Sequence, residues 1–429
     1  MLAQLVNVLY SIVDRMYIGI GVGNLALAGV GVCGPIVTLL SSVSSLVGLG
    51  GSPILAMRMG AGKKREAQQI LNHSFLMLLI LSVALTILFL VSKDRLLMWF
   101  GASQSTFEYA DIYLTIYTAG TFFALMSAGM NSFLIAQGFS GLGMATVMMG
   151  AAFNIVLDPI LIFVFRMGVA GAATATVISQ MASCVFVLLS LSQKKMPVRL
   201  GWGDFHWPVI RQILSFGFSP FLIIASDSVI LIALNTVLQK YGGPNEGDIL
   251  ITCATIVQSY LLLITMPLGG ITLGSQPVVS FNYGAGNVRR IRQAFICIIG
   301  LCVTFCTLMT VVTHLFSPIY VNLFTKDAEI LHRSVMYIKR FTAMIIPLAV
   351  QYPLVDEITA LGQVRLALFC SVFRKSVFLV SLLLLPALFS AEATFFSEPV
   401  ADLIAATVTT TLFLHAFPRI MAKRTKEGQ

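Results

Sequence analysis

Residues 53–69 read PILAMRMGAGKKREAQQ, and residues 277–293 read PVVSFNYGAGNVRRIRQ. An offset of 224 residues superimposes their proline, their Gly-Ala-Gly tripeptide, one arginine and one glutamine. Without a gap, the same offset pairs Phe100 with Phe324, Tyr113 with Tyr337, Ala136 with Ala360 and Gly138 with Gly362. Shared proline, glycine and arginine positions in one register rarely arise by chance, so the sequence predicts two copies of one structural unit.

Both copies consist almost entirely of apolar runs. Of the 429 residues, 57% are hydrophobic and 10% are charged, whereas a soluble domain carries about 25% charged residues. A helix crosses a bilayer with about 20 apolar residues. Such runs cover residues 1–20, 30–59, 71–91, 109–136, 144–165, 170–191, 209–238, 250–281, 294–316, 334–360, 366–389 and 400–417. We therefore expect an all-α polytopic membrane protein with about twelve transmembrane helices, six in each repeat.

The first run resembles a signal peptide only superficially. It lacks a basic N-terminal region and carries Asp14 and Arg15 inside its apolar stretch, which a signal peptide does not. We interpret it as a membrane helix. Because it is short for a full crossing, we expect the chain to begin part-way into a helix that is usually longer.

The net charge is +9, and the positions of the basic residues follow the expected membrane topology. Basic residues gather after the second, sixth and eighth runs and at the C-terminus: Arg58, Lys63, Lys64, Arg65, Lys194, Lys195, Arg199, Arg211, Arg289, Arg290, Arg292, Arg419, Lys423, Arg424 and Lys426. With twelve spans these sites share one side of the membrane, and an excess of Lys and Arg marks the cytoplasmic side. We expect a multi-pass protein of the cell membrane with both termini in the cytoplasm, and no nucleic-acid partner.

An even number of spans in each copy makes the two repeats parallel. We expect an N-terminal six-helix lobe at 1–192, a basic cytoplasmic linker at 193–208, a C-terminal lobe at 209–422 and a basic tail at 423–429. The glycine- and proline-containing segments 48–53 and 267–277 occupy corresponding places in the two copies. We interpret them as hinges for alternating access, with close helix packing as the alternative.

Acids inside membrane spans are candidate functional groups, because an ionised carboxylate in hydrocarbon is costly. The candidates are Asp14, Asp158, Asp227, Asp356 and Glu357. In the fifth expected helix, Asn154 and Asp158 lie one turn apart, and the adjacent Pro159 removes the helical hydrogen bond of a backbone carbonyl. Hard oxygen ligands of this kind suit Na⁺ or protons and not soft metals.

Two further groups of oxygen atoms accompany this pair. Asn7, Tyr10 and Asp14 share one face of the first expected helix, at spacings of three and four residues. In the sixth expected helix, Thr176 and Gln180 lie beside small residues that allow close helix approach.

If Asp14 and Asp158 converge, they should titrate as one unit that exchanges a proton or Na⁺. Packing at a proline kink is the alternative for Asp158, and helix packing is an equal alternative for Asn154 and Thr176.

The acids of the second half allow less to be inferred. Asp227 lies at a position that loosely resembles that of Asp14 if an insertion around residues 241–248 is allowed. Asp356 and Glu357 point about 100° apart around their helix, so at most one faces a cavity squarely. Either acid could attract a cationic substrate, and hydrogen bonding to a neighbouring helix is an equal alternative.

Neither the cysteines nor the histidines indicate a metal site or a disulfide framework. All seven cysteines fall within apolar runs, and no two of the five histidines are spaced with a carboxylate as metal ligands. We expect the cysteines to be packing residues and the protein to carry no cofactor.

Several motifs together indicate a known family. They are YSIVD at 10–14, ALAGV at 26–30, the Gly-Ala-Gly loop at 60–62, NIVLDP at 154–159, GVAGAATAT at 168–176 and YGAGN at 283–287. They closely resemble the multidrug and toxic compound extrusion (MATE) family, above all its bacterial MepA-like and DinF-like branch. The resemblance covers essentially the whole chain.

The resemblance implies a V-shaped fold of twelve helices and a secondary active antiporter, which exports organic cations or drugs in exchange for H⁺ or Na⁺. It implies an ion-coupling site at Asp14, Asn154, Asp158 and Thr176, where Na⁺ would bind, with Tyr10 nearby. Asn7, Gln180, Asp227, Asp356 and Glu357 are our candidates for the substrate cavity. Arg15 and the Asp356–Glu357 pair depart from the family pattern.

Two other functions are less favoured. A flippase for lipid-linked oligosaccharides or lipids would need a cationic cavity, and the intramembrane charge is mainly acidic. An intramembrane aspartyl protease would need a Gly-x-Gly-Asp motif around one of its two buried aspartates, and none of the aspartates inside the expected spans has this motif. We therefore expect a transporter and not an enzyme, monomeric in the lipid bilayer, with small organic cations or drugs as its partners.

Overall fold

The computed structural model describes residues 6, 13–14, 17–18, 22, 24–99, 106–201, 206–322 and 327–427, which form helices without a strand among them. The first half contains α2 (Asn24–Gly60), α3 (Lys64–Trp99), α4 (Phe107–Ala119), α5 (Thr121–Ala136), α6 (Ser140–Pro159), the π-helical turn η1 (Ile160–Val164) and α7 (Gly168–Ser192). The second half contains α8 (Trp207–Gly284), α9 (Val288–Val321), α10 (Ala328–Phe341), α11 (Ile345–Ala360), α12 (Val364–Leu388), the 3₁₀ turn η2 (Ala391–Phe396) and α13 (Ser397–Glu427).

Nine helical segments of the described chain are long and apolar enough to cross a membrane, and two bent helix pairs raise the number to eleven. Helix α8 supplies two of these segments, Trp207–Gly243 and Ile249–Gly284, because Gly243 has a positive φ of 68° that interrupts the helix. The expected first span, 1–20, lies largely outside the described residues. The all-α, multi-pass membrane fold is confirmed.

The helix boundaries repeat at the offset of 224 residues. Helix α2 ends at Gly60 and α8 at Gly284, and the glycines two positions later, Gly62 and Gly286, have φ values of 73° and 72°. This left-handed conformation is open to glycine and ends a helix. Other boundaries also match. Helices α5 and α11 begin and end at equivalent residues, α3 and α9 begin at equivalent residues, and so do α6 and α12. The motif that reveals the duplication is thus the turn that ends a helix in each copy.

The spans expected at 109–136 and 334–360 are not single straight helices. The first is bent by 56° between α4 and α5, and the second by 51° between α10 and α11. In the first copy the break falls at Gly120, where an added Cβ atom would lie 2.5 Å from the side chain of Val177. Close contact with α7 therefore accompanies the bend, which a hydropathy pattern alone does not reveal.

Helices α2 and α8 run without a break through segments 48–53 and 267–277, where hinges are expected, so the hinge interpretation stays a prediction. In α2 these glycines allow close packing: a Cβ atom at Gly48 would lie 2.9 Å from the carbonyl oxygen of Gly129. A Cβ atom at Gly51 would lie 2.6 Å from the ring of Phe133. Packing of helix against helix explains the glycines of this segment.

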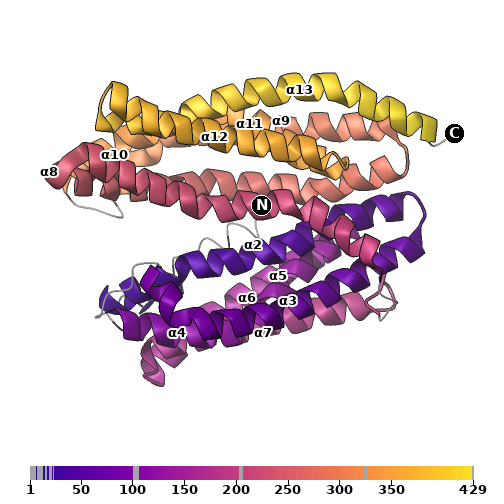
Figure 1. Ribbon diagram of the computed structural model, residues 1–429, viewed down its shortest axis with the longest axis horizontal. Coiled ribbons are helices and arrows are strands. Elements are labelled where there is room, and N and C mark those ends of the chain that lie inside the picture. The colour runs from indigo at the N-terminus through magenta and orange to yellow at the C-terminus, as the bar shows by residue number, and fades with distance from the viewer. Residues whose placement is uncertain are drawn as a thin grey trace. The chain divides into compact units, whose positions relative to one another are not determined.

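The chain divides into two compact units, residues 2–225 and 226–429. In the first unit α2 packs against α3 and α5, and α6 packs against α7 (indigo to magenta in Figure 1). In the second unit α12 and α11 pack against α13, and α11 against α9 (orange to yellow in Figure 1). The exact limits of the lobes and linker expected from the sequence stay a prediction.

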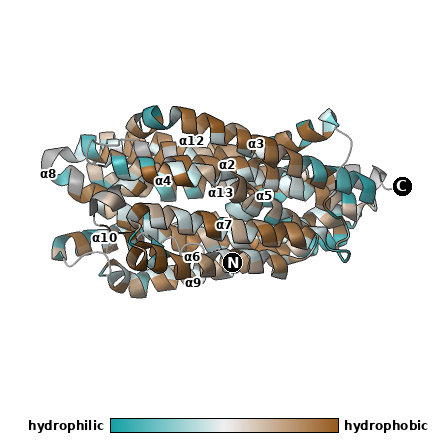
Figure 2. Cartoon of the chain, turned by 90° about the horizontal axis from the view of Figure 1, so that it is seen from below, coloured by the Kyte–Doolittle hydropathy of each residue, from teal (hydrophilic) through white to brown (hydrophobic). Residues whose placement is uncertain are grey.

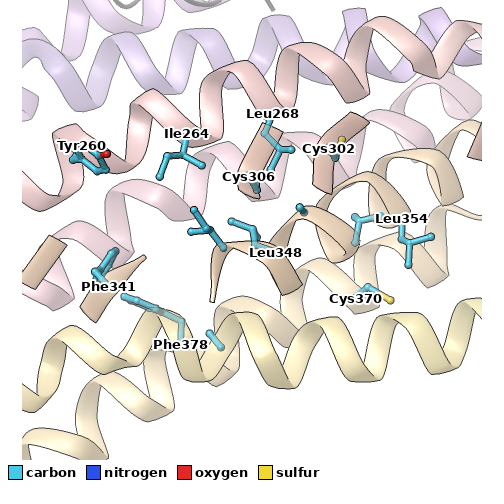
Figure 3. Close-up of a cluster of buried hydrophobic side chains, with 14 of the residues drawn as sticks. Tyr260, Ile264, Leu268, Cys302, Cys306, Phe341, Leu348, Leu354, Cys370 and Phe378 are labelled. Atoms are coloured by element: carbon cyan, nitrogen blue, oxygen red, sulfur yellow. The ribbon is translucent and has the colours of Figure 1, made fainter. Parts of the chain in front are cut away.

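Each unit has its own apolar core. Figure 3 shows the one in the second unit, where Tyr260, Leu268 and Phe378 gather with the cysteines of α9 and α12. All seven cysteines are free thiols, and all but Cys297 are buried, as packing residues should be. Outward-facing side chains are also apolar, and Figure 2 shows hydrophobic residues along most of the helix lengths. This distribution matches helices that lipid surrounds.

Candidate functional site

The polar cluster of the first unit lies where α6 ends. Pro159 occupies the last position of α6, and the chain continues directly as the π-helical turn η1. A π-helical turn inside a helical run often accompanies a functional site. Here it follows Asp158, whose side chain is completely buried.

Helix α7 completes the cluster because it approaches closely. A Cβ atom at Gly171 would lie 2.9 Å from the backbone of Leu161, so only glycine permits this contact. The amide of Asn154 donates to Asp158 Oδ1 at 3.2 Å and to Thr176 Oγ1 at 3.5 Å. The Thr176 hydroxyl in turn donates to the carbonyl of Ala172 at 3.0 Å, which leaves its lone pairs directed at the cluster.

Asp14 faces this cluster from the first helical segment. Its carboxyl group lies close enough to that of Asp158 for a direct electrostatic interaction. Two carboxylates at such a range repel each other, so the pair is stable with one proton or one cation between them. The structure thus brings together Asp14, Asn154, Asp158 and Thr176, whereas Asn7 and Tyr10 lie outside the described residues.

The donor set fits a hard monovalent cation or a proton. It comprises two carboxyl groups, one hydroxyl group and the amide oxygen of Asn154, which is buried and accepts no hydrogen bond from the described part of the chain. Oxygen ligands of this kind suit Na⁺ and not thiophilic metals. Within the described residues no three His, Cys, Asp or Glu side chains gather as a metal site.

A cavity of about 300 Å³ adjoins the cluster within the first unit. Its polar lining includes Tyr117, Asn131 and Gln180 together with Asn154 and Thr176. Gln180 donates from Nε2 to the Tyr117 hydroxyl at 3.3 Å. No Asp, Glu, Lys or Arg occurs in the described lining, and the acid pair is linked to it through the hydrogen bond of Asn154 to Asp158. The cavity and the acid cluster share Asn154 and Thr176.

The second repeat lacks a copy of this cluster. Phe378, Leu382 and Val400 stand where Asn154, Asp158 and Thr176 stand in the first repeat. Phe378 and Leu382 are buried in the apolar core of the second unit. The duplicated fold therefore carries the Asn154–Asp158 pair in one copy and apolar core residues at the equivalent positions of the other.

The adjacent acids of α11 both hydrogen-bond to α8. The Thr272 hydroxyl donates to Asp356 Oδ2 at 2.6 Å, and the Ser275 hydroxyl donates to Glu357 Oε1 at 2.8 Å. Glu357 is fully buried. The contacts are those expected of the alternative in which these acids hold a neighbouring helix.

Two basic residues in the middle of α12 were missed by the sequence reasoning. Lys375 pairs with Asp227 at 2.6 Å, and Arg374 pairs with Asp402 and Glu398 of α13. The intramembrane charge of the second unit therefore includes two basic residues, although its acids still outnumber them. Two adjacent basic residues inside the expected span 366–389 were the available signal.

The comparisons with known proteins agree with this architecture. The MatE family model matches residues 1–160 and again residues 224–385, once for each repeat. The multidrug export protein MepA of Staphylococcus haemolyticus is 24% identical over 408 residues, covering 95% of this chain and 89% of that protein. MepA of Staphylococcus aureus strain N315 is 22% identical over 412 residues, with the same coverage.

Two solved structures are similar over nearly the whole chain. A multidrug resistance MATE family transporter of the MOP superfamily, in an outward-facing conformation, has a TM-score of 0.91 and 25% identity, covering 98% of this chain and 93% of that one. A MOP superfamily transporter from Pyrococcus furiosus, described as having a binding pocket of reversed polarity, gives the same values. With its model matched in both repeats, the chain belongs to the MatE family of membrane transporters.

Proposed function

We propose that this protein is a secondary active multidrug efflux antiporter, which exports organic cations or drugs in exchange for H⁺ or Na⁺ by alternating access. The names of the MepA relatives support the export of drugs. The observation that carries the exchange is that Asn154 and Thr176 belong both to the acid cluster and to the lining of the cavity.

The coupling step follows from the chemistry of the acid pair. A proton or Na⁺ between Asp14 and Asp158 neutralises their repulsion, and its departure restores a net negative charge. When the carboxylates reorganise, the amide of Asn154 changes partner or orientation, because it donates to Asp158 Oδ1. That rearrangement alters the cavity wall, so the affinity for the drug depends on whether the ion is bound, and the affinity for the ion depends on whether the drug is bound.

The cavity suits flat, partly polar ligands. Tyr117 supplies an aromatic ring, and the amide oxygens of Asn131 and Gln180 are buried acceptors without a hydrogen-bond donor among the described residues. A drug with an N–H group would satisfy these acceptors. Its positive charge would be attracted by the acid pair when the coupling ion has left.

The distribution of Lys and Arg supports insertion in the cell membrane with both termini in the cytoplasm. We propose a monomer in the lipid bilayer, with no enzymatic step. Arg374 and Lys375 do not favour lipid-linked anions as substrates, because each is paired with carboxylates.

The test is transport by the purified protein in liposomes. A fluorescent organic cation is loaded, and proton and Na⁺ gradients are imposed separately. Wild-type protein should move the dye against its gradient with one of the two ions, and Asp14→Asn or Asp158→Asn should abolish driven transport while the protein remains folded. Asp94→Asn, an exposed acid of α3, is the matched control and should retain transport. Gradient-driven transport by both site variants at the wild-type rate would refute the coupling site.

A further inference from the structure

Lys375 in α12 forms an ion pair that joins two distant parts of the second unit. Its ammonium group donates to Asp227 Oδ1 at 2.6 Å and to the Ser226 hydroxyl at 2.7 Å. The lysine side chain is 15% exposed, whereas the aspartate side chain is 63% exposed. The carboxylate of Asp227 is therefore largely exposed, whereas the side chain of Lys375 is mostly covered by the protein.

Asp227 lies near the middle of the candidate span Trp207–Gly243. An ionised side chain exposed at that depth is costly in lipid, so we expect its exposed side to face an aqueous path. A cationic ligand that reaches this path meets a carboxylate whose charge is already compensated by Lys375.

The position of Lys375 corresponds to a cavity wall in the first repeat. At the offset of 224 residues, Arg374 and Lys375 are equivalent to Gly150 and Ala151, which line the cavity described above. The second copy thus places two basic side chains where the first copy leaves space. Arg374 is committed to Asp402 and Glu398, so Lys375 is the residue that pairs with the exposed acid.

We propose that Lys375 is an internal cation that competes with ligands for Asp227 and thereby sets the charge class of the ligands bound there. This inference rests on the proposed function. A monocation that takes Asp227 leaves the buried lysine ammonium beside Arg374 without its carboxylate, which is costly. A zwitterionic ligand binds Asp227 through its cationic group and offers its own carboxylate to Lys375, so every charge remains paired. The site therefore prefers zwitterions to monocations.

A matched dye pair tests this preference. A rhodamine with a free carboxylate and its methyl ester share one ring system, but only the ester has a net positive charge. We expect wild-type protein to bind the carboxylate form about fivefold more tightly, the size of one ion-pair contact at a partly exposed site. Lys375→Met should remove or reverse this ratio by strengthening ester binding, whereas Asp227→Asn should weaken ester binding most.

Two controls make the result specific. The double variant Asp227→Asn/Lys375→Met removes both charges of the ion pair, so neither is left without its partner. It should therefore fold and bind both dyes equally. Lys93→Met breaks a similar contact in the first unit, where Lys93 pairs with Asp111 at 2.6 Å and donates to the Thr115 hydroxyl at 3.1 Å. It should leave the binding ratio unchanged.

A purely structural role for Lys375 would change the affinity for both dyes alike, so an unchanged ratio in Lys375→Met overturns the inference. That result is distinct from failure of the proposed function. If wild-type liposomes transport the ester dye but the ratio does not respond, only the role of Lys375 is refuted. If wild-type liposomes move neither dye under either gradient, the antiport proposal fails first and the inference fails with it.

Discussion

Replacing Arg374 by methionine should destabilise the second unit by about 3–5 kcal/mol, the usual effect of removing one partner from a buried ion pair. Arg374 donates from Nε and Nη2 to Asp402 Oδ1 at 2.9 and 2.8 Å, and Nη2 also pairs with Glu398. Asp402 is completely buried, and Glu398 is 8% exposed. Without the guanidinium group, the two carboxyl groups of α13 lose the cation that pairs with them in the described part of the chain, and they must take up protons or draw in water.

The assay can use the protein's own thiols. A maleimide dye that fluoresces on reaction reports unfolding, because Cys370 is buried one turn before Arg374. For a unit of this size, the loss corresponds to a fall in melting temperature on the order of 10 °C. The triple variant Arg374→Met/Glu398→Gln/Asp402→Asn removes every charge of the cluster and should recover most of the stability. The reasoning is refuted if Arg374→Met melts with the wild type, or if the triple variant melts as low as the single one.

Thr176→Val keeps the side-chain shape but removes the hydroxyl group that Asn154 contacts. Ion-driven efflux should therefore fall about tenfold, as for the loss of a polar contact worth about 1.4 kcal/mol. An equal loss of efflux in Thr176→Ser, which keeps the hydroxyl group, would contradict this. Gly217→Ala places a Cβ atom 1.7 Å from the Leu46 carbonyl oxygen and should cost at least about 3 kcal/mol in thermal unfolding. Gly31→Ala, where nothing lies within 4 Å, should cost nothing, and equal melting of the two variants would refute the clash. His73→Phe removes the Nε2 acceptor of the His206 backbone N–H, a 2.8 Å bond, so trypsin should cleave the segment 193–208 faster than in the wild type; equal rates would show that this bond does not hold the segment.

The duplication could be predicted from local sequence because the residues that reveal it have a local conformational reason. Gly62 and Gly286 adopt nearly the same positive φ, which other residues avoid. The grouping of Asn154 with Asp158 was also predictable, since a spacing of four residues places both on one helix face. Their proposed roles stay predictions.

The features that escaped prediction depend on contacts between distant residues. Lys375 and Asp227 are 148 positions apart, and no periodic pattern signals their pairing. The bend between α4 and α5 has no proline at or near its break, and it coincides with the close contact of Gly120 with Val177. Likewise, the close contacts of Gly48 with Gly129 and of Gly51 with Phe133 follow no local pattern.

The two bends belong to the repeated unit and not to one residue at the break. Helices α5 and α11 begin at equivalent positions, yet the preceding residue is Gly120 in one copy and Met344 in the other. The angles are nearly equal, 56° in one copy and 51° in the other, although these residues differ. A substitution at the break is therefore a weaker handle on the bend than a change in the helices packed around it.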